Sequence, residues 1–300
     1  MSPSDTPGGR WSDLDRPPLN ATALRRALIR PGGLWTSLEV VPATGSTNTD
    51  LAAAAVRGAA EGTVLIAEEQ TAGRGRLDRN WSAPPRSGLF FSVLLRPGDR
   101  VPAERWVWLP LLAGVATATA LSRSAGVDTA LKWPNDVLLT STPDTGAGPG
   151  RVPAPVERKC GGILAERAGD AVVLGVGINV SLRADELPVP TAGSLALAGA
   201  ANVDRDPVLR AVLRSLEEWY GRWRETGGDP SASRLQQAYA AGCATLGRTV
   251  RAELPGGRAT VGEAVAVDGD GRLVIATADG AHESVAAGDI VHLRAASAGE

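Results

Sequence analysis

Polar and apolar positions along the chain alternate between short, nearly continuous apolar runs and longer alanine-rich segments. The runs have the length of β-strands, and turn-forming residues separate them. One run, "GLFFSVLLR", is apolar almost throughout, which predicts a strand covered on both faces. Another, "ALKWPNDVLL", is interrupted by Pro134. The predicted strands are residues 37–43, 63–69, 88–96, 130–139, 157–167 and 171–182.

The segments between these strands carry the signals of helices. "STNTDLAAAAVRGAAEG" has an alanine-rich interior, with Ser46 or Thr47 as its N-cap and Gly62 near its end. The predicted helices are residues 46–62, 102–126, about 207–226 and about 230–245. Alternating strands and helices of this kind predict an α/β domain over residues 31–246.

The two ends of the chain differ from this middle part. The first 20 residues are rich in Pro, Gly and Asp, so residues 1–30 are expected to form a disordered tail in which only a short segment from residue 20 can start the fold. Residues 141–156 are rich in Pro, Gly and Thr and predict a disordered hairpin connection. From residue 247 to 297, short strands between turn signals predict a small β-barrel.

Composition narrows the possible functions. The 31 Lys and Arg residues nearly balance 33 Asp and Glu residues, which argues against non-specific binding of nucleic acid or an anionic membrane. Two cysteines and two histidines are too few for a disulfide framework, and they make a zinc site or a serine–histidine triad improbable. No stretch has the length and apolar character of a membrane span or signal peptide. We therefore expect a reduced, cytoplasmic protein.

"QTAGRGRLDRNW", residues 70–81, is the first segment with candidate chemistry. Gly73 and Gly75 allow the backbone to approach a ligand, and Arg74 and Arg76 offer planar donor groups for carboxylate or phosphate. Trp81 can supply a flat face for an aromatic base. Taken alone, the segment is better explained as an exposed loop with solvated arginines, because short Gly/Arg motifs recur by chance, whereas an RNA-binding Arg-Gly segment would repeat.

Two further segments place polar groups at element ends. "GSTNTD", residues 45–50, offers hydroxyl and amide groups at a helix N-terminus, although ordinary capping explains the same residues. "KWPND" places Lys132, Asn135 and Asp136 beside a proline within an apolar run, where a plain turn is the alternative interpretation.

Glycine interrupts the next two predicted strands. "RKCGGILAE" combines Lys159 with Gly161 and Gly162, and "LGVGINV" combines Gly175 and Gly177 with Asn179. Glycine inside a strand often marks the close approach of a ligand, although an edge bulge is an alternative for the first segment. The second lacks the third glycine and the following helix of a dinucleotide-binding fingerprint. Together with the three polar segments above, these make five polar or glycine interruptions at strands of one predicted sheet. Such an arrangement indicates one cleft across that sheet.

In this order and spacing, "GSTNTDL", "EEQTAGRGRLDRNW", "KWPND", "KCGGILAE" and "GVGINV" resemble the biotin protein ligase family, over residues 30–295. The resemblance implies an α/β (α+β) catalytic domain of the class II synthetase-like, biotin–lipoate ligase type, with a mixed sheet and a C-terminal SH3-like barrel. It implies two steps. The carboxylate of biotin attacks the α-phosphate of Mg²⁺-bound ATP to form biotinyl-5′-AMP, and a lysine of a biotin carboxyl carrier domain then takes the biotin.

Roles for individual residues follow from that resemblance. The catalytic candidates are Arg74, Arg76, Lys159 and Asp136, of which Asp136 is expected to orient or deprotonate the incoming lysine. The candidates for binding biotin are Ser46, Thr47, Asn48, Gln70, Gly73, Arg74, Gly75, Arg76, Lys159, Gly161, Gly162 and Gly175, with Gly177 beside them. The candidates for binding ATP are Arg76, Trp81, Lys132, Asn135, Asp136 and Asn179. Small glycines are expected to leave a slot open for the apolar part of biotin, and Trp81 is expected to lie against adenine.

Departures from the family pattern and rival functions refine these expectations. "LDRN", residues 77–80, is less basic and glycine-rich than the family loop, so retention of the adenylate can differ. A DNA-binding winged helix has no room before the first strand, which predicts a ligase that binds no operator. The rivals are a lipoate–protein ligase, a non-catalytic biotin sensor and an RNA-binding protein. Pairing of edge strands could produce a homodimer.

Overall fold

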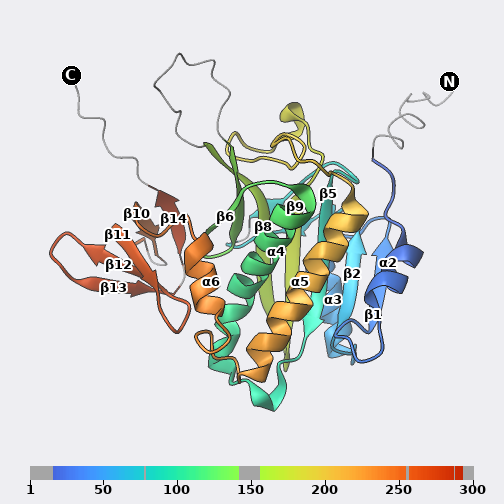
Figure 1. The fold of residues 1–300 in the computed structure, drawn as a ribbon, viewed down its shortest axis with the longest axis horizontal. Helices are drawn as coiled ribbons and strands as arrows, with labels where there is room; N and C mark the ends of the chain where they lie inside the picture. The colour runs from blue at the N-terminus through green and yellow to red at the C-terminus, as the bar shows by residue number, and fades with distance from the viewer. Residues whose placement is uncertain (1–15, 78, 142–155, 255–256, 287, 293–300) are drawn as a thin grey trace.

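The computed structural model describes residues 16–77, 79–141, 156–254, 257–286 and 288–292. Seven strands form its central sheet: β1 (Ser37–Val41), β2 (Thr63–Ala67), β5 (Gly88–Leu95), β6 (Thr129–Lys132), β7 (Asp136–Ser141), β8 (Val156–Ala168) and β9 (Ala171–Asn179). Their order is β1-β2-β5-β9-β8-β7-β6 (Figure 1). Only the β1–β2 pair among these described neighbours is parallel, so the sheet is mixed, as expected.

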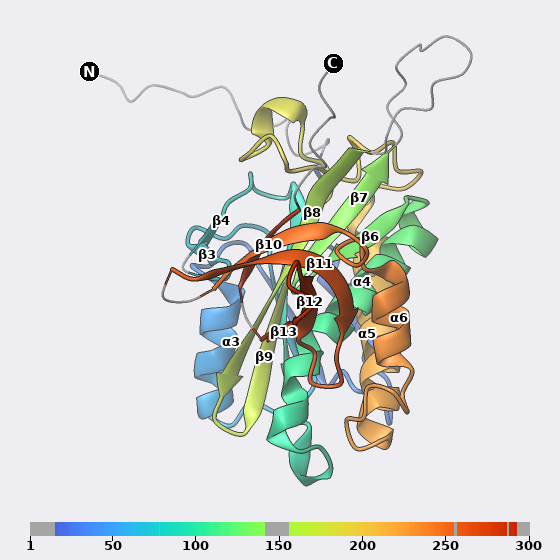
Figure 2. The ribbon, with the colours of Figure 1, turned by 90° about the vertical axis from the view of Figure 1, so that its left-hand side faces the viewer.

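Helices cover both faces of this sheet. The α-helices are α2 (Ala21–Leu28), α3 (Thr47–Val56), α4 (Leu109–Ala125), α5 (Arg205–Glu225) and α6 (Leu235–Gly242), and the 3-10 helices are η1 (Gly98–Arg100), η2 (Ala103–Trp108) and η3 (Ala184–Glu186). α4 and α5 pack on one face, whereas α3 packs on β5, β8 and β9 from the other (Figure 2).

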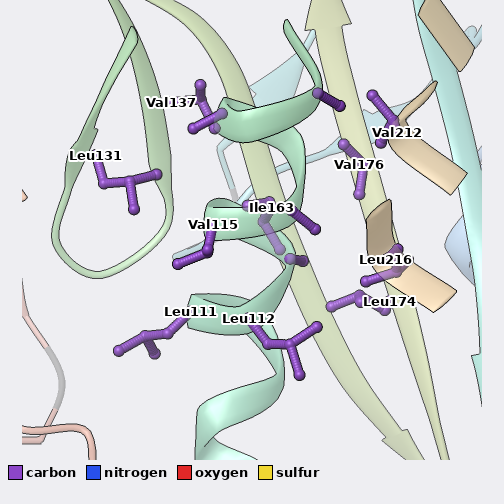
Figure 3. Packing of buried hydrophobic residues seen from close by; sticks show 14 of the residues in the cluster. Leu111, Leu112, Val115, Leu131, Val137, Ile163, Leu174, Val176, Val212 and Leu216 are labelled. Atoms are coloured by element: carbon purple, nitrogen blue, oxygen red, sulfur yellow. The ribbon is translucent and has the colours of Figure 1, made fainter. Parts of the chain in front are cut away.

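The two faces bury different residues of the same strands because successive strand residues point in opposite directions. On the α4 side the core is built by α4, α5 and the sheet, as Figure 3 shows for Leu111, Leu112, Val115, Ile163, Leu174, Val176, Val212 and Leu216. Under α3, Leu51 and Ala55 pack with Leu94 and Val173. All eight residues of β5 are buried, which confirms the strand predicted to be covered on both faces.

Three predicted helices have different bounds in the structure. The predicted 102–126 helix is two elements, because η2 precedes α4 and the α-helix starts only at Leu109. The last predicted helix is shorter, since α6 covers only Leu235–Gly242. α3 ends at Val56, well before Gly62. Gly62 instead adopts a positive φ at a site where a side chain would collide with the carbonyl oxygen of Leu34.

The expected disordered tail of residues 1–30 is too long. α2 begins at Ala21, capped by the side chain of Asn20, and buries Leu24 and Leu28. The preceding segment is held by a buried ion pair between Glu68 and Arg205, at 2.6 Å. Glu68 accepts a hydrogen bond from the backbone of Leu19, and Arg205 donates to the carbonyl of Pro17. Apolar burial and this ion pair therefore bring the N-terminal segment into the fold from at least residue 17 onward.

Other expectations fall partly outside the described residues. These include the tail up to residue 15, the connection at 142–155, Asp78 within "LDRN", and the chain from residue 293. The ends of the connection are described, and they pair as an antiparallel β7–β8 ladder from Ser141 and Val156. β8 and β9 are joined by the predicted "AGD" turn, with Ala168 opposite Ala171.

The C-terminal part is a separate small sheet. Its strands are β10 (Thr249–Glu253), β11 (Ala259–Val267), β12 (Leu273–Thr277), β13 (His282–Val285) and β14 (Asp289–His292). All neighbouring pairs are antiparallel, in the order β13-β12-β11-β10-β14. The expected small β unit is thus present beside α6 and the central sheet (Figure 1). In the described part of the chain, no helix is long and apolar enough to cross a membrane.

Candidate active site

The N-terminus of α3 and the segment at residue 70 meet on the α3 face of the sheet. Ser46 is the N-cap and accepts a hydrogen bond from the backbone of Thr49, as the sequence predicted. Gln70 Oε1 accepts hydrogen bonds from Thr47 N at 2.9 Å and from Thr47 Oγ1 at 3.1 Å. The side-chain amide of Gln70 therefore satisfies a helix N-terminal donor, which couples this loop to α3.

Asn48 lies at the centre of a buried polar cluster. Its Oδ1 is 2.6 Å from the hydroxyl of Ser92 on β5, which also contacts Thr47 Oγ1 at 2.8 Å. Gly175 provides the space for this arrangement, since a Cβ there would stand only 2.2 Å from Asn48 Oδ1. Ser92 was not among the sequence candidates, because a serine in an otherwise apolar strand carries no motif.

Glu166 connects this cluster to the loop that carries Arg74 and Arg76, which we call the arginine loop. Its Oε2 accepts a hydrogen bond from Asn48 Nδ2 at 2.8 Å, and its Oε1 pairs with Arg74 Nη1 at 2.9 Å. The carboxylate thus joins β8 to α3 and to the two-stranded hairpin that carries Arg74. "KCGGILAE" contains Glu166 as its last letter, but its position in the segment does not reveal these partners.

Gly162 on β8 and Gly175 and Gly177 on β9 form a surface that we call the glycine floor, and other side chains cover it. β3 (Gly73–Arg74) pairs with β4 (Asn80–Trp81), and this hairpin lays the Trp81 ring on β8 and β9. A Cβ on Gly177 would be 2.9 Å from that ring, and one on Gly162 would be 3.0 Å away. The expected empty slot is therefore corrected: Trp81 occupies the space above Gly162 and Gly177, just as Asn48 occupies the space above Gly175.

Gly161 faces the opposite side of the sheet. A Cβ there would meet the carbonyl oxygen of Gly177 at 3.0 Å and the side chain of Val137, which belongs to the core under α4. The side-chain positions of adjacent strand residues point to opposite faces of the sheet. Gly161 and Gly162 therefore cannot both leave space for a ligand on the same face. The expectation that both line the biotin slot is wrong for Gly161.

Close backbone packing explains the glycines of the arginine loop. A Cβ on Gly73 would stand 2.4 Å from the carbonyl oxygen of Trp81 in the opposite strand. Gly75 N donates to the carbonyl of Arg79 at 2.6 Å, which closes the loop tip. Within "LDRN", Leu77 is exposed and has a positive φ. Both glycines therefore lie in the tightly packed backbone of this hairpin.

Arg76 and Asn135 meet at the edge of the floor. Arg76 Nη1 donates to Asn135 Oδ1 at 3.3 Å, and Asn135 Nδ2 donates to the carbonyl of Ile163 at 2.9 Å. Burial lowers the pKa of Arg76, and Arg79 lowers it further, although Asp136 opposes them. The guanidinium is therefore partly desolvated, which strengthens its interaction with an anion.

Asp136 faces several cations. Its Oδ1 lies 2.6 Å from Lys159 Nζ, and it also interacts electrostatically with Arg76 and Lys132. Burial lowers the pKa of Lys132; Lys159 contributes to this, and Asp136 opposes it. Lys159 Nζ lies 5.8 Å from the Trp81 ring centroid. Three cations around one carboxylate leave excess positive charge beside the glycine floor.

Asn179 helps to close the far side of the site. Its Nδ2 donates to the carbonyl of Gly193 at 3.0 Å. The same segment pairs with β8, because Lys159 N donates to Thr191 O and Gly193 N donates to Lys159 O. The sequence candidates did not include residues 191–193, which have no catalytic motif and reach the site only through this pairing.

The described residues contain no group of three or more His, Cys, Asp or Glu side chains that could hold a metal ion. Both cysteines, Cys160 and Cys243, are free and buried, and burial raises the pKa of Cys160 to about 12. Thiol chemistry therefore has no part in this site. The site therefore consists of three parts: the glycine floor, a polar cap and a cation cluster. The polar cap is formed by Ser46, Thr47, Asn48 and Gln70, and the cation cluster by Arg76, Lys132 and Lys159.

Comparison with known proteins gives this arrangement a context. Residues 40–182 match the biotin/lipoate A/B protein ligase family, and residues 245–293 match the biotin protein ligase C-terminal domain. The chain is 43% identical to the biotin–[acetyl-CoA-carboxylase] ligase of Mycobacterium tuberculosis, over 94% of this chain and 98% of that protein. It is 32% identical to the bifunctional ligase/repressor BirA of Bacillus spizizenii, over 81% of this chain and 69% of that protein.

A solved structure is similar over the same region. Biotin protein ligase from Aquifex aeolicus, in complex with biotin and ATP, has a TM-score of 0.68 and 28% sequence identity. The match covers 87% of this chain and 100% of that one.

Proposed function

The chain belongs to the biotin protein ligase family, and we propose that it joins biotin to one lysine of a biotin carboxyl carrier domain of an acyl-CoA carboxylase, at the expense of ATP. In the first step a biotin carboxylate oxygen bonds to the α-phosphorus of ATP, and diphosphate leaves. In the second, the deprotonated lysine amine bonds to the acyl carbon of biotinyl-5′-AMP, and AMP leaves with the electron pair of the broken acyl–oxygen bond.

The cation cluster carries this proposal. A carboxylate and a triphosphate repel each other, and fixed cations at the point of attack lower that barrier without reorganisation. Arg76, Lys132 and Lys159 converge on Asp136 from the arginine loop, β6 and β8. We assign Arg76 and Lys159 to the reacting anions and Lys132 to the phosphates. Arg74, which pairs with Glu166, is assigned to the same reaction.

The remaining assignments follow from position. Ser46, Thr47, Asn48 and Gln70 form the polar cap, which suits the neutral, polar head group of biotin. Gly162, Gly175 and Gly177 line the floor, and a ligand that uses this floor must displace Trp81 or stack against it. Asn135 and Asn179 stand at the edges of the same region, where we place the adenylate.

Asp136 changes partners in this scheme. While Lys159 is paired with Asp136, the carboxylate cannot serve the incoming lysine. When Lys159 turns to the acyl phosphate, Asp136 is left to orient the carrier amine and accept its proton. An anionic ligand that draws Lys159 out of the ion pair therefore frees Asp136 to act as the base.

Mg²⁺ is expected to arrive bound to ATP, where it neutralises phosphate charge. The absence of a protein metal cluster among the described residues is compatible with an ion held mainly by phosphates. We place the reaction in the cytoplasm, where ATP is present. A homodimer and the lack of operator binding remain predictions, which sedimentation and a DNA shift assay at physiological salt would test.

One assay tests the main proposal. The protein is incubated with ATP, Mg²⁺ and a carrier domain, in the presence of either biotin or lipoate, and the mass of the carrier is measured. We expect a mass gain on one lysine with biotin only. A gain with lipoate alone would establish the rival lipoate ligase, and no gain on a carrier that a known ligase modifies would refute the proposal.

A further inference from the structure

The tryptophan of "KWPND" lies away from the glycine floor. Trp133 is buried, and its Nε1 donates a hydrogen bond to the carbonyl of Gly271 at 3.0 Å. Gly271 belongs to the turn that joins β11 and β12 in the C-terminal sheet. The backbone N of Trp133 donates to Thr245 Oγ1, at the start of that unit. Trp133 thus contacts the C-terminal unit at two points.

A second tryptophan holds the same turn. Trp108, at the end of η2, is fully buried and donates from Nε1 to the carbonyl of Gly269 at 2.9 Å. Arg105 donates to the same oxygen at 3.1 Å. Two indoles, one from η2 and one from the turn between β6 and β7, therefore donate to alternate carbonyls of one turn.

The turn is itself rigid. Asp268 accepts hydrogen bonds from the backbone of Asp270 and Arg272, and its carboxylate pairs with Arg272 Nε at 2.9 Å. Arg272 also pairs with Asp270. An anchored carbonyl in such a turn constrains the whole segment 268–272, which we name the anchored turn.

The anchored turn forms one wall of a groove of about 600 Å³. Its lining includes Asp270, Gly271 and Arg272 of the anchored turn, and Arg76, Trp133 and Asn135 of the catalytic unit. The same groove therefore begins at two residues of the candidate active site and ends on the C-terminal unit. The lining of this groove includes none of the polar-cap residues Ser46, Thr47, Asn48 and Gln70.

We propose that Trp133 is a positioning residue, whose indole N–H holds the anchored turn in the groove that Arg76 and Asn135 also line, and so makes the C-terminal unit part of the ATP-binding region. Because "KWPND" contains both Trp133 and Asn135, the motif couples the two units directly. Loss of the indole donor should loosen the turn and weaken ATP binding, and biotin binding should be unaffected. The effect on ATP rests on the proposed function, whereas the effect on the turn does not.

The test uses three Trp→Phe variants of the full chain. Trp133→Phe and Trp108→Phe each remove one donor to the anchored turn. Trp223→Phe is the matched control, because the buried Trp223 Nε1 has no hydrogen-bond partner among the described residues. Hydrogen exchange at 268–272 should accelerate about three- to tenfold in Trp133→Phe, as one lost neutral hydrogen bond predicts. It should accelerate less in Trp108→Phe, where Arg105 remains, and not at all in the control.

Kinetics of adenylate formation give the second measurement. Trp133→Phe should raise KM for ATP several-fold, and Trp108→Phe should raise it by a smaller factor. KM for biotin should stay within twofold of wild type in both variants. A raised KM for ATP in Trp133→Phe alone would mean a local effect on "KWPND" and would overturn the inference. So would unchanged exchange at 268–272. If the wild-type protein forms no adenylate, the proposed function fails, and the exchange result alone decides whether the tether exists.

Discussion

Lys159 Nζ lies 2.6 Å from Oδ1 of Asp136, between neighbouring strands β8 and β7. A lysine expected to bind an anion is thus held by a carboxylate expected to act as a base. Each group keeps the other in place beside the Trp81 ring, and neither can complete its proposed role until the pair opens.

Replacing Asp136 with Asn should separate the two steps. The amide keeps the shape but cannot accept the proton of the carrier lysine, so transfer from preformed adenylate should slow by at least about a hundredfold. Adenylate formation, measured by ATP–diphosphate exchange, should fall much less. Equal losses in both steps would show that Asp136 acts only by positioning Lys159.

Arg76→Ala should reduce adenylate formation by about a hundredfold, since removing one preorganised donor to a developing charge typically costs about 3 kcal/mol. The melting temperature should change little, because among the described residues the side chain makes one long hydrogen bond, to Asn135. Arg26→Ala, at an exposed position of α2, is the charge-matched control. Near-normal turnover of Arg76→Ala would remove this residue from the site.

Gly175→Ala should weaken biotin binding by tenfold or more. Its methyl group would meet Asn48 Oδ1 at 2.2 Å and displace the side chain that Ser92 and Glu166 hold. Overpacking of this kind also costs about 1–3 kcal/mol of stability. Titration calorimetry with biotin measures the first effect. Gly221→Ala in α5, where no atom beyond the chain neighbours and the backbone of the helix itself lies within 4 Å of the new Cβ, should bind biotin normally and be slightly more stable.

Glu166→Gln should loosen the arginine loop. Asn48 and Arg74 donate to different oxygens of Glu166, and Gln replaces one of those oxygens with a donor NH2 group. The ion pair is partly exposed, with side-chain exposures of 27% and 47%, so its loss is worth about 0.2–1 kcal/mol. We expect KM for biotin to rise up to about fivefold and trypsin to cleave sooner after Arg74. Unchanged cleavage would mean that the pair does not restrain the loop.

Stability should fall as pH drops from about 6.5 to about 4. Burial, with Lys132 and Arg248, lowers the pKa of His292 from 6.5 to about 4, against the opposing effect of Glu157. In that range the unfolded chain binds a proton that the folded chain does not, so protonation favours unfolding. After allowance for solvent screening the loss is about 1–2 kcal/mol. Urea titrations should show a shallower pH dependence in His292→Gln, and an identical slope would contradict this origin.

Local sequence patterns were sufficient for most strands and for the outline of the site. β5, β8 and β9 appear where apolar runs predict them, because burial of such runs is favourable in any arrangement of the sheet. Ser46 caps α3 because capping depends only on neighbouring residues. The ordered motifs were enough to indicate the family, since their chemistry is carried by residue type and spacing.

The remaining features depend on register and strand order, which no single segment specifies. Gly161 and Gly162 are adjacent in sequence, yet Gly161 faces Val137 in the α4 core and Gly162 faces Trp81 on the α3 side of the sheet. α2 became part of the fold because Leu24 and Leu28 found a buried place beside distant elements.

By itself, the sequence determined the family, the strand and helix segments, and the groups from which the site is built, because these follow from local pattern and residue chemistry. Only the tertiary structure decided that Trp81 covers the glycine floor, that Glu166 joins Asn48 to Arg74, and that Trp133 reaches Gly271. Each of these contacts joins residues distant in sequence, and their geometry exists only once the strands have paired and the C-terminal unit has docked.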